Sequence, residues 1–167
     1  MLTVVLAALS AAAVIVVGLR LYMGRVAEDQ LRPGEDVAIA ALRGPLAANA
    51  FLACPPGYCA VAEAVVSPVF AVSADRLAEY WAQMIAAEPR LVQIAAEPGQ
   101  QRAVLIQRSA LFRFPDLVTV EFVALAPERS SLALYSRARY GRSDFGVNRR
   151  RVLRWLSRLQ QIAGAAD

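Results

Sequence analysis

The residues best suited to chemistry lie in one stretch near the C-terminus, where arginines crowd around two glycines and an aspartate. Planar guanidinium groups bind phosphates and carboxylates through paired hydrogen bonds. Ser143 or Asp144 can cap a helix that begins near Gly146, and such a helix N-terminus adds backbone N–H donors for an anion. The stretch therefore predicts a binding surface for phosphate headgroups, an acidic partner or a carboxylate ligand. The predicted surface comprises Arg137, Arg139, Arg142, Asp144, Asn148, Arg149, Arg150 and Arg151.

A structural interpretation of the same arginines stands beside the binding interpretation. Asp144 can simply cap the helix and pair with Arg142 or Arg149. Arg137 and Arg139 share one face of a strand, because side chains alternate, and they can bridge that strand to the helix. Both roles use the same residues, so their positions in the fold decide between them.

The chain has few of the side chains that enzymes use for catalysis. The chain has no His and no Lys, which excludes His-based triads, His metal ligands and Schiff-base lysines. Two Cys alone cannot close a zinc site, so we expect no metal and no cofactor. Ser109, Asp116, Glu121 and Asp144 are the only plausible acids, bases or nucleophiles, and their spacing points to no reaction. A secondary candidate site between two expected strands comprises Ser109, Arg113 and Asp116. We predict that the protein is not an enzyme.

Charge is unevenly divided along the 167 residues. Hydrophobic residues make up 57% of the chain, charged residues 19%, and all 18 positive charges are arginines. Residues 1–101 carry six arginines and nine acids, whereas residues 102–167 carry 12 arginines and five acids. The basic surface therefore belongs to the C-terminal part of a chain whose length fits one domain.

The N-terminal segment predicts a membrane anchor over residues 1–23. Met1–Leu19 contains no charge, and as a helix it extends about 28 Å, close to the ~30 Å hydrocarbon core of a bilayer. Arg20 can snorkel and Tyr22 can sit at the headgroup level. A cleaved signal peptide is the alternative, but the segment lacks the positively charged start and the small-residue cleavage site of such a peptide.

Two features disagree about the side of the membrane on which the domain lies. Arg20, Arg25 and Arg32 follow the span, which favours a cytoplasmic domain by the positive-inside rule. Cys54 and Cys59 flank a Pro-Pro-Gly turn signal that can bring their thiols together, and a disulfide implies an oxidising compartment such as a periplasm. Two unpaired thiols are the alternative. We expect a single-pass protein of the bacterial inner membrane with a periplasmic domain, and a cytoplasmic domain is the alternative.

These residues must be positioned by an α+β domain over residues 61–163, after a linker with a Pro- and Gly-rich loop at residues 24–60. Apolar runs predict strands at residues 65–72, 91–96, 101–111, 117–125 and 132–140. Ser73 can cap an amphipathic helix that stops at Pro89, and the C-terminal segment forms a second helix. Short turns join most strands, which implies an antiparallel sheet. We therefore predict an antiparallel sheet of about four to five strands packed against two helices, preceded by a single N-terminal transmembrane helix.

Four groups of residues between about 60 and 160 form a recognisable pattern: Gln107–Ser109, Phe114–Asp116, Tyr135–Arg137, and Gly141–Asn148 with the Arg149–Arg151 triplet. Together they resemble a known family, the domain of unknown function 1499, which is found in bacteria and plastids. The resemblance implies an N-terminal membrane segment before the domain, as in many members, and it implies no particular activity. Many relatives have Pro-Asn-Cys-Val-Ser-Ser before the first strand, where this chain has Pro56-Gly57-Tyr58-Cys59-Ala60.

We expect an accessory or interaction protein that docks on a larger membrane protein complex through the arginine-rich surface. The anchor, the missing catalytic groups and the basic patch support this function. The alternative is a lipid or small-ligand binding module with an apolar cavity between sheet and helices, lined by Phe112, Phe114, Phe122, Tyr135 and Trp155. The same aromatic residues can instead fill an ordinary core. We expect no nucleic-acid partner, because the chain is anchored and has few aromatics beside its basic patch.

Overall fold

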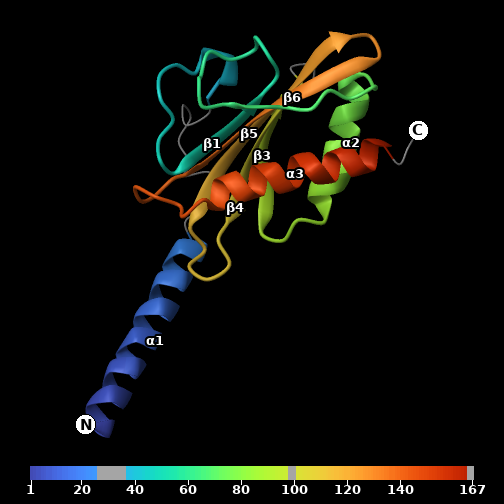
Figure 1. Ribbon diagram of the computed structural model, residues 1–167. Helices are drawn as coiled ribbons and strands as arrows, with labels where there is room; N and C mark the ends of the chain where they lie inside the picture. The colour runs from blue at the N-terminus through green and yellow to red at the C-terminus, as the bar shows by residue number, and fades with distance from the viewer. Residues whose placement is uncertain (26–36, 98–100, 165–167) are drawn as a thin grey trace.

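The computed structural model describes residues 1–25, 37–97 and 101–164 (Figure 1). Residues 26–36 of the expected linker, including Arg32, lie outside the described residues. An apolar helix precedes a sheet that carries two long helices on one face (Figure 1). The elements are α1 (Leu2–Arg25), the 3₁₀ turn η2 (Ile39–Ala41), β1 (Ala50–Cys54), β2 (Val65–Val66), α2 (Ala74–Ala86), β3 (Leu91–Glu97), β4 (Arg102–Arg108), β5 (Pro115–Ala126), β6 (Arg129–Ala138) and α3 (Val147–Gly164).

The sheet has six strands in the order β2-β1-β6-β5-β4-β3. Strands β3 to β6 and the β1–β6 pair are antiparallel, whereas β1 and β2 run parallel. The α+β class is confirmed, but the prediction of a purely antiparallel sheet of four to five strands is wrong. The error lies at one edge, where residues 50–54 of the expected linker form β1 between β2 and β6.

The first expected strand, residues 65–72, is much shorter in the structure. Only Val65 and Val66 pair with β1. Proline has no N–H for a sheet ladder, so Pro68 interrupts the run, and Phe70 then makes an isolated antiparallel bridge to Ser130. The segment therefore changes neighbours within a few residues, from β1 to the start of β6.

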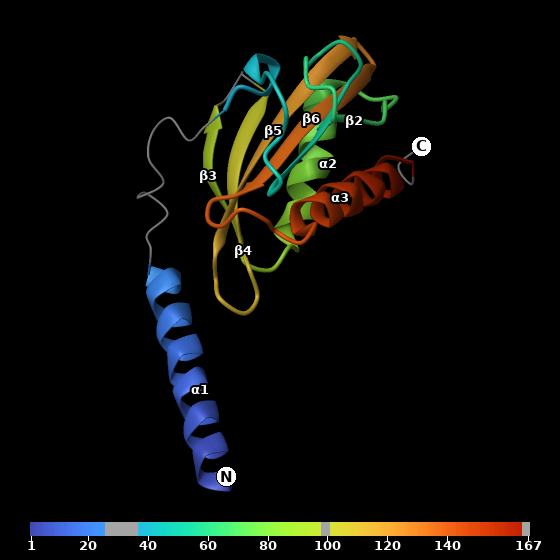
Figure 2. The same cartoon turned by 60° about the vertical axis from the view of Figure 1, so that its left-hand side comes forward.

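Helices α2 and α3 cover one face of the sheet, as the sequence predicted (Figures 1 and 2). The Ser73 side chain accepts a hydrogen bond from the Arg76 N–H at 3.2 Å and so caps α2, which presents Leu77, Tyr80, Trp81 and Met84 to the core. Trp81 packs edge-on against Trp155 of α3, with ring centroids 5.5 Å apart. Burial of each large apolar side chain contributes roughly 1.5–3 kcal/mol, so these contacts fix α3 firmly on the sheet.

The opposite face of the sheet is covered by the chain around β1, which the sequence had placed in a linker. Ile39, Leu52, Val61 and Tyr135 are among the buried residues of this second apolar cluster. Glu121 of β5 holds the covering segment, because its carboxylate accepts from the Ile39 N–H at 3.0 Å and from the Tyr58 hydroxyl at 2.8 Å. The part of the segment from residue 37 onward is therefore packed on the domain.

Helix α1 is long and apolar enough to cross a membrane. Its C-terminal end lies beside the loop between β4 and β5 (Figures 1 and 2). Arg20 donates to the carbonyl oxygens of Ala110 and Leu111 at 2.6 and 2.8 Å. In return Arg108 donates to the Met23 carbonyl at 2.9 Å. These bonds join the apolar helix to one end of the domain, which is also the end where α3 begins.

Candidate functional site: the arginine-rich end of the domain

Strand register determines which polar side chains face α3. Asp116 and Ser136 lie on neighbouring strands near the end of the β5–β6 ladder, where Asp116 pairs with Ala138 and Val118 pairs with Ser136. Side chains alternate along a strand, so both residues share the helix-covered face with the core residues Val118 and Val120. Polar groups thus replace apolar ones where the sheet approaches the first turns of α3.

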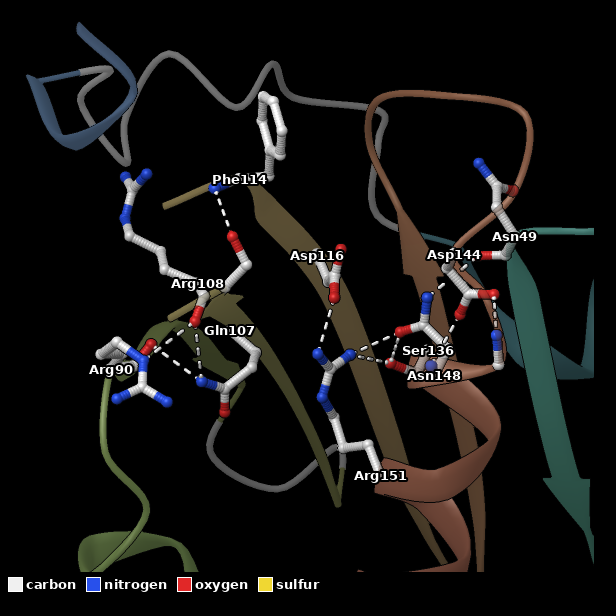
Figure 3. Close-up of polar contacts among 12 residues, drawn as sticks. Asn49, Arg90, Gln107, Arg108, Phe114, Asp116, Ser136, Asp144, Asn148 and Arg151 are labelled. Carbon is white, nitrogen blue, oxygen red and sulfur yellow. Dashed lines mark hydrogen bonds and ion pairs between the residues drawn. The ribbon is translucent and has the colours of Figure 1, made fainter. Parts of the chain in front are cut away.

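Arg151 is the centre of a buried polar network at this end (Figure 3). Its guanidinium donates to the Asp116 carboxylate at 2.6 Å, to the Ser136 hydroxyl at 2.9 Å and to the Asn148 side-chain oxygen. The Ser136 hydroxyl donates in turn to the Asn148 oxygen at 2.6 Å. Burial raises the pKa of Asp116, which the positive charge of Arg151 opposes. Arg151 therefore joins β5, β6 and α3 and leaves few of its donors for a ligand.

Asn148 extends the network to β1. Its amide nitrogen donates to the Asn49 carbonyl at 3.0 Å, and the Asn49 amide donates to the Gly141 carbonyl at 2.7 Å. Both Asn148 and Arg151 are thus structural, as the alternative interpretation of the stretch proposed. Sequence reasoning missed Asn49, which stood in the expected linker without a recognisable motif.

Asp144 caps α3. Its two carboxylate oxygens accept from the backbone N–H groups of Gly146 at 2.9 Å and Asn148 at 2.6 Å. A carboxylate at this position also interacts favourably with the helix dipole. Asp144 therefore takes the capping role that the sequence offered for it, and the helix N-terminus is already occupied by an acceptor.

The remaining arginines of the predicted surface divide by exposure. Arg137 and Arg139 are half-buried, whereas Arg142, Arg149 and Arg150 are exposed. Arg139 lies over the ring of Tyr140, with its guanidinium carbon 5.7 Å from the centroid, and Arg149 lies 5.9 Å from the centroid of Phe51. Consecutive helix residues point about 100° apart, because α-helices have 3.6 residues per turn, so the Arg149–Arg151 triplet divides between surface and interior.

Phe145 is exposed in the middle of this surface. Its side chain is 87% exposed, and its backbone is left-handed with φ of 52°. Its N–H donates to the Ser143 hydroxyl at 3.3 Å, and its carbonyl accepts from the Arg150 guanidinium at 2.9 Å. These bonds hold an apolar ring in solvent beside exposed guanidinium groups. We call residues 139–150 the arginine loop.

A cavity of about 470 Å³ opens between the first turns of α3, the end of β4 and the α2–β3 turn. We call it the arginine pocket. Five arginines line it: Arg90, Arg108, Arg150, Arg151 and Arg154.

Glu88 supplies a carboxylate to the pocket lining. Its two oxygens accept from Arg154 at 3.0 Å and from Arg158 at 3.2 Å. Five arginines line the pocket, against the carboxylates of Glu88 and of Asp116, the partner of Arg151, so the local charge is net positive. An anion is therefore the ligand that its electrostatics favour.

Gln107 forms part of the pocket wall and is 6% exposed. Its amide nitrogen donates to the Pro89 carbonyl at 2.9 Å. It also lies 3.3 Å from the carbonyl oxygens of Arg90 and Arg108 (Figure 3). Its side-chain oxygen is buried and has no hydrogen-bond partner among the described residues. A buried acceptor without a donor costs about 1–3 kcal/mol, and a ligand that carries a donor removes that cost.

Arg90 stands at the pocket in a left-handed conformation, with φ of 61°. Its carbonyl accepts from the Arg108 N–H at 3.0 Å, which holds the turn. Glycine adopts such a φ at less cost than arginine does. The turn therefore carries a guanidinium group at a position where the backbone conformation favours glycine. Arg90, Gln107, Arg108 and Arg154 were not predicted as site residues; Gln107 and Arg108 were noticed only through the family resemblance.

The secondary candidates Ser109, Arg113 and Asp116 serve the β4–β5 connection and α3. The Ser109 hydroxyl accepts from the Phe114 N–H at 3.0 Å and so closes the loop, in which Arg113 has a φ of 63°. Asp116 pairs with Arg151. Glu121, the remaining acid of the catalytic candidates, lies on the opposite face of the sheet, so the structure does not bring these groups together.

The Cys54 and Cys59 sulfurs form a disulfide, with a Cα–Cα distance of 6.4 Å. It lies at the end of β1, on the sheet face away from α2 and α3. Tyr58 stands between the two cysteines in sequence, and burial with its bond to Glu121 raises the pKa of its hydroxyl to about 12.

One family matches the chain. A family model described as a protein of unknown function, DUF1499, matches residues 55–159, and the resemblance found in the sequence is thereby confirmed. None of the curated proteins matches the chain. The matched range includes every residue of the arginine pocket and the whole arginine loop.

Proposed function

We propose that this chain, which belongs to the DUF1499 family, is a membrane-anchored, non-catalytic accessory protein that docks on a membrane protein complex through the arginine loop. One observation carries the proposal: Phe145 is 87% exposed and held by hydrogen bonds among exposed arginines. Aromatic residues and arginines are enriched at the centres of protein–protein interfaces. A loop already ordered before binding loses less conformational entropy when it docks.

The anchor supports a partner that lies in or beside the membrane. We propose that α1 spans the bacterial inner membrane and stays attached to the domain. The bonds of Arg20 to the β4–β5 loop keep the arginine-rich end near the helix end. A Phe114–Tyr140 ring contact, with centroids 6.3 Å apart, connects that loop to the arginine loop. The Cys54–Cys59 disulfide supports a periplasmic domain, because disulfides persist in oxidising compartments.

Photocrosslinking in native membranes tests the docking. The full chain carries a benzophenone amino acid at position 145 or, as a control, at Gln160, an exposed residue near the far end of α3. We expect one discrete protein adduct from position 145 and none from position 160. A substitution of Arg142 by Glu should weaken that adduct. Lipid adducts alone at position 145, or equal protein adducts from both positions, would refute the docking proposal.

The ligand-binding alternative has a specific observation in its favour, the arginine pocket. The five aromatics expected around one cavity are dispersed. Phe122 and Trp155 belong to the main core, Phe112 and Phe114 stack in the β4–β5 loop with centroids 5.7 Å apart, and Tyr135 faces the other side of the sheet. A ligand site between sheet and helices is thus proposed at their polar end.

A further inference from the structure

We propose that the arginine pocket binds the phosphate of an anionic phospholipid headgroup from the membrane that α1 spans. The pocket shares Arg150 with the arginine loop but does not include Phe145. This proposal therefore does not rest on protein docking, although it extends the ligand-binding alternative.

The first step is charge. Arg90, Arg108, Arg150 and Arg154 line the cavity together with Arg151, and Glu88 already accepts from two arginines. Phosphate oxygens accept the paired N–H groups of guanidinium in charge-assisted hydrogen bonds. A volume of about 470 Å³ is within the usual range for small-ligand sites. The pocket therefore has the charge and the space for a phosphodiester with its neighbouring atoms.

The second step is the unpartnered acceptor. The Gln107 side-chain oxygen is buried, has no hydrogen-bond partner among the described residues, and belongs to a residue of the pocket wall. A headgroup hydroxyl can donate to it once the Gln107 amide turns toward the cavity. Phosphatidylglycerol carries both a phosphate and hydroxyl groups, whereas phosphatidylcholine carries no headgroup donor and no net charge. The chemistry of the pocket therefore favours an anionic headgroup with a hydroxyl.

The third step is position. Arg108 lines the pocket and donates to the Met23 carbonyl of α1, and Arg20 of α1 bonds to Ala110 at the rim. The charge-free run ends at Leu19, so about 28 Å of helix lies in the hydrocarbon and Arg20 reaches the headgroup level. The pocket therefore stands at the depth of lipid phosphates. Leu111 is 57% exposed beside the pocket and can enter the membrane–water interface.

Lipid retention by the full chain tests the proposal. The protein is reconstituted in nanodiscs of phosphatidylcholine with one-fifth phosphatidylglycerol, extracted gently, and weighed intact by native mass spectrometry. We expect the wild type to retain one phosphatidylglycerol in preference to phosphatidylcholine. One charge-assisted hydrogen bond is worth about 1.5–3 kcal/mol, so loss of a pocket arginine should lower retention by about tenfold or more.

Two matched pairs of variants separate the pocket from general positive charge. Arg154→Gln and Arg158→Gln each remove a partner of Glu88, but only Arg154 lines the pocket. Their side chains are 59% and 42% exposed, so both variants should fold. Arg150→Gln and Arg149→Gln form the second pair. We expect the Arg154 and Arg150 variants to lose phosphatidylglycerol and the other two to retain it within twofold.

The source of the phosphate is decided by competition. Soluble glycerol 3-phosphate or inorganic phosphate is added at millimolar concentration to nanodiscs of phosphatidylcholine alone and to nanodiscs that also contain one-fifth phosphatidylglycerol. If either soluble phosphate binds and stays bound in the discs that contain phosphatidylglycerol, the pocket serves a soluble phosphate and the lipid proposal is overturned. Equal retention of both lipids by the wild type, or equal losses in all four variants, overturns it as well. A failed crosslink at position 145 affects only the docking proposal.

Discussion

The Arg151 guanidinium lies 2.6 Å from the Asp116 carboxylate, inside the junction of β5 and α3. The stretch with the most arginines is therefore only partly exposed to solvent. Arg149 and Arg150, its neighbours in sequence, are exposed, whereas Arg151 is buried with Ser136 and Asn148. The structural interpretation applies to Arg151, and the binding interpretation stays a prediction for the exposed arginines.

Arg151→Gln should lower the free energy of unfolding by about 3–5 kcal/mol, because it leaves the Asp116 carboxylate buried without its charged partner. Arg149→Gln should change it by under about 0.5 kcal/mol, because that side chain is exposed. Denaturant unfolding in mild detergent measures both. Equal effects of the two substitutions would contradict the buried role of Arg151. An Asp116→Leu, Arg151→Met double variant should recover much of the loss, because no charge then remains unpaired.

Tyr58 should titrate later than an ordinary tyrosine, because burial and the Glu121 carboxylate raise its pKa from 10.0 to about 12. The folded pKa exceeds the unfolded one. The stabilisation is therefore complete below pH 10 and is lost as pH rises through about 12. The phenolate absorbance of wild type minus that of Tyr58→Phe isolates this group. Glu121→Gln should move the transition back toward pH 10; an unshifted transition would contradict the Tyr58–Glu121 contact.

The disulfide should be present in the purified chain. Alkylation without a reductant should leave Cys54 and Cys59 unmodified, and alkylation after reduction should modify both. A short loop of this length gives about 2 kcal/mol by the chain-entropy relation, so the Cys54→Ser, Cys59→Ala double variant should be less stable by that amount. If both thiols are fully labelled in chains isolated from cells under non-reducing conditions, the disulfide is excluded. The support for a periplasmic domain is then lost as well.

Much of the fold was predictable from α2 onward, because long apolar runs indicate the strands and Ser73, Pro89 and Asp144 mark where helices begin or end. Strand β1 was not, because Ala50–Cys54 is short and is surrounded by proline and glycine. Its burial comes from pairing with β6, more than eighty residues later in the chain. A parallel partner for β1 depends on the same tertiary arrangement.

The candidate site was predictable only where its residues are consecutive. The Arg149–Arg151 triplet and the cap at Asp144 stand out in one stretch. The pocket instead collects Arg90 from a turn, Gln107 from β4 and Arg154 from the second turn of α3. Each is an isolated polar residue in the sequence, and the sheet register together with the Trp81–Trp155 contact brings them to one cavity.

The bonds between Arg20 and the β4–β5 loop should set the depth of that loop at the membrane. A spin label at Leu111, introduced as Leu111→Cys with Cys54 and Cys59 replaced, reports depth through its accessibility to oxygen and to a water-soluble relaxer. In the labelled chain that keeps Arg20, we expect the label to lie at the membrane–water interface. Arg20→Gln should make it more accessible to the water-soluble relaxer, because two side-chain-to-carbonyl bonds are lost. Arg129→Gln, an exposed change at the start of β6, is the control. Unchanged accessibility in Arg20→Gln would show that the anchor does not position the arginine-rich end, and the depth argument for a lipid ligand would then fail.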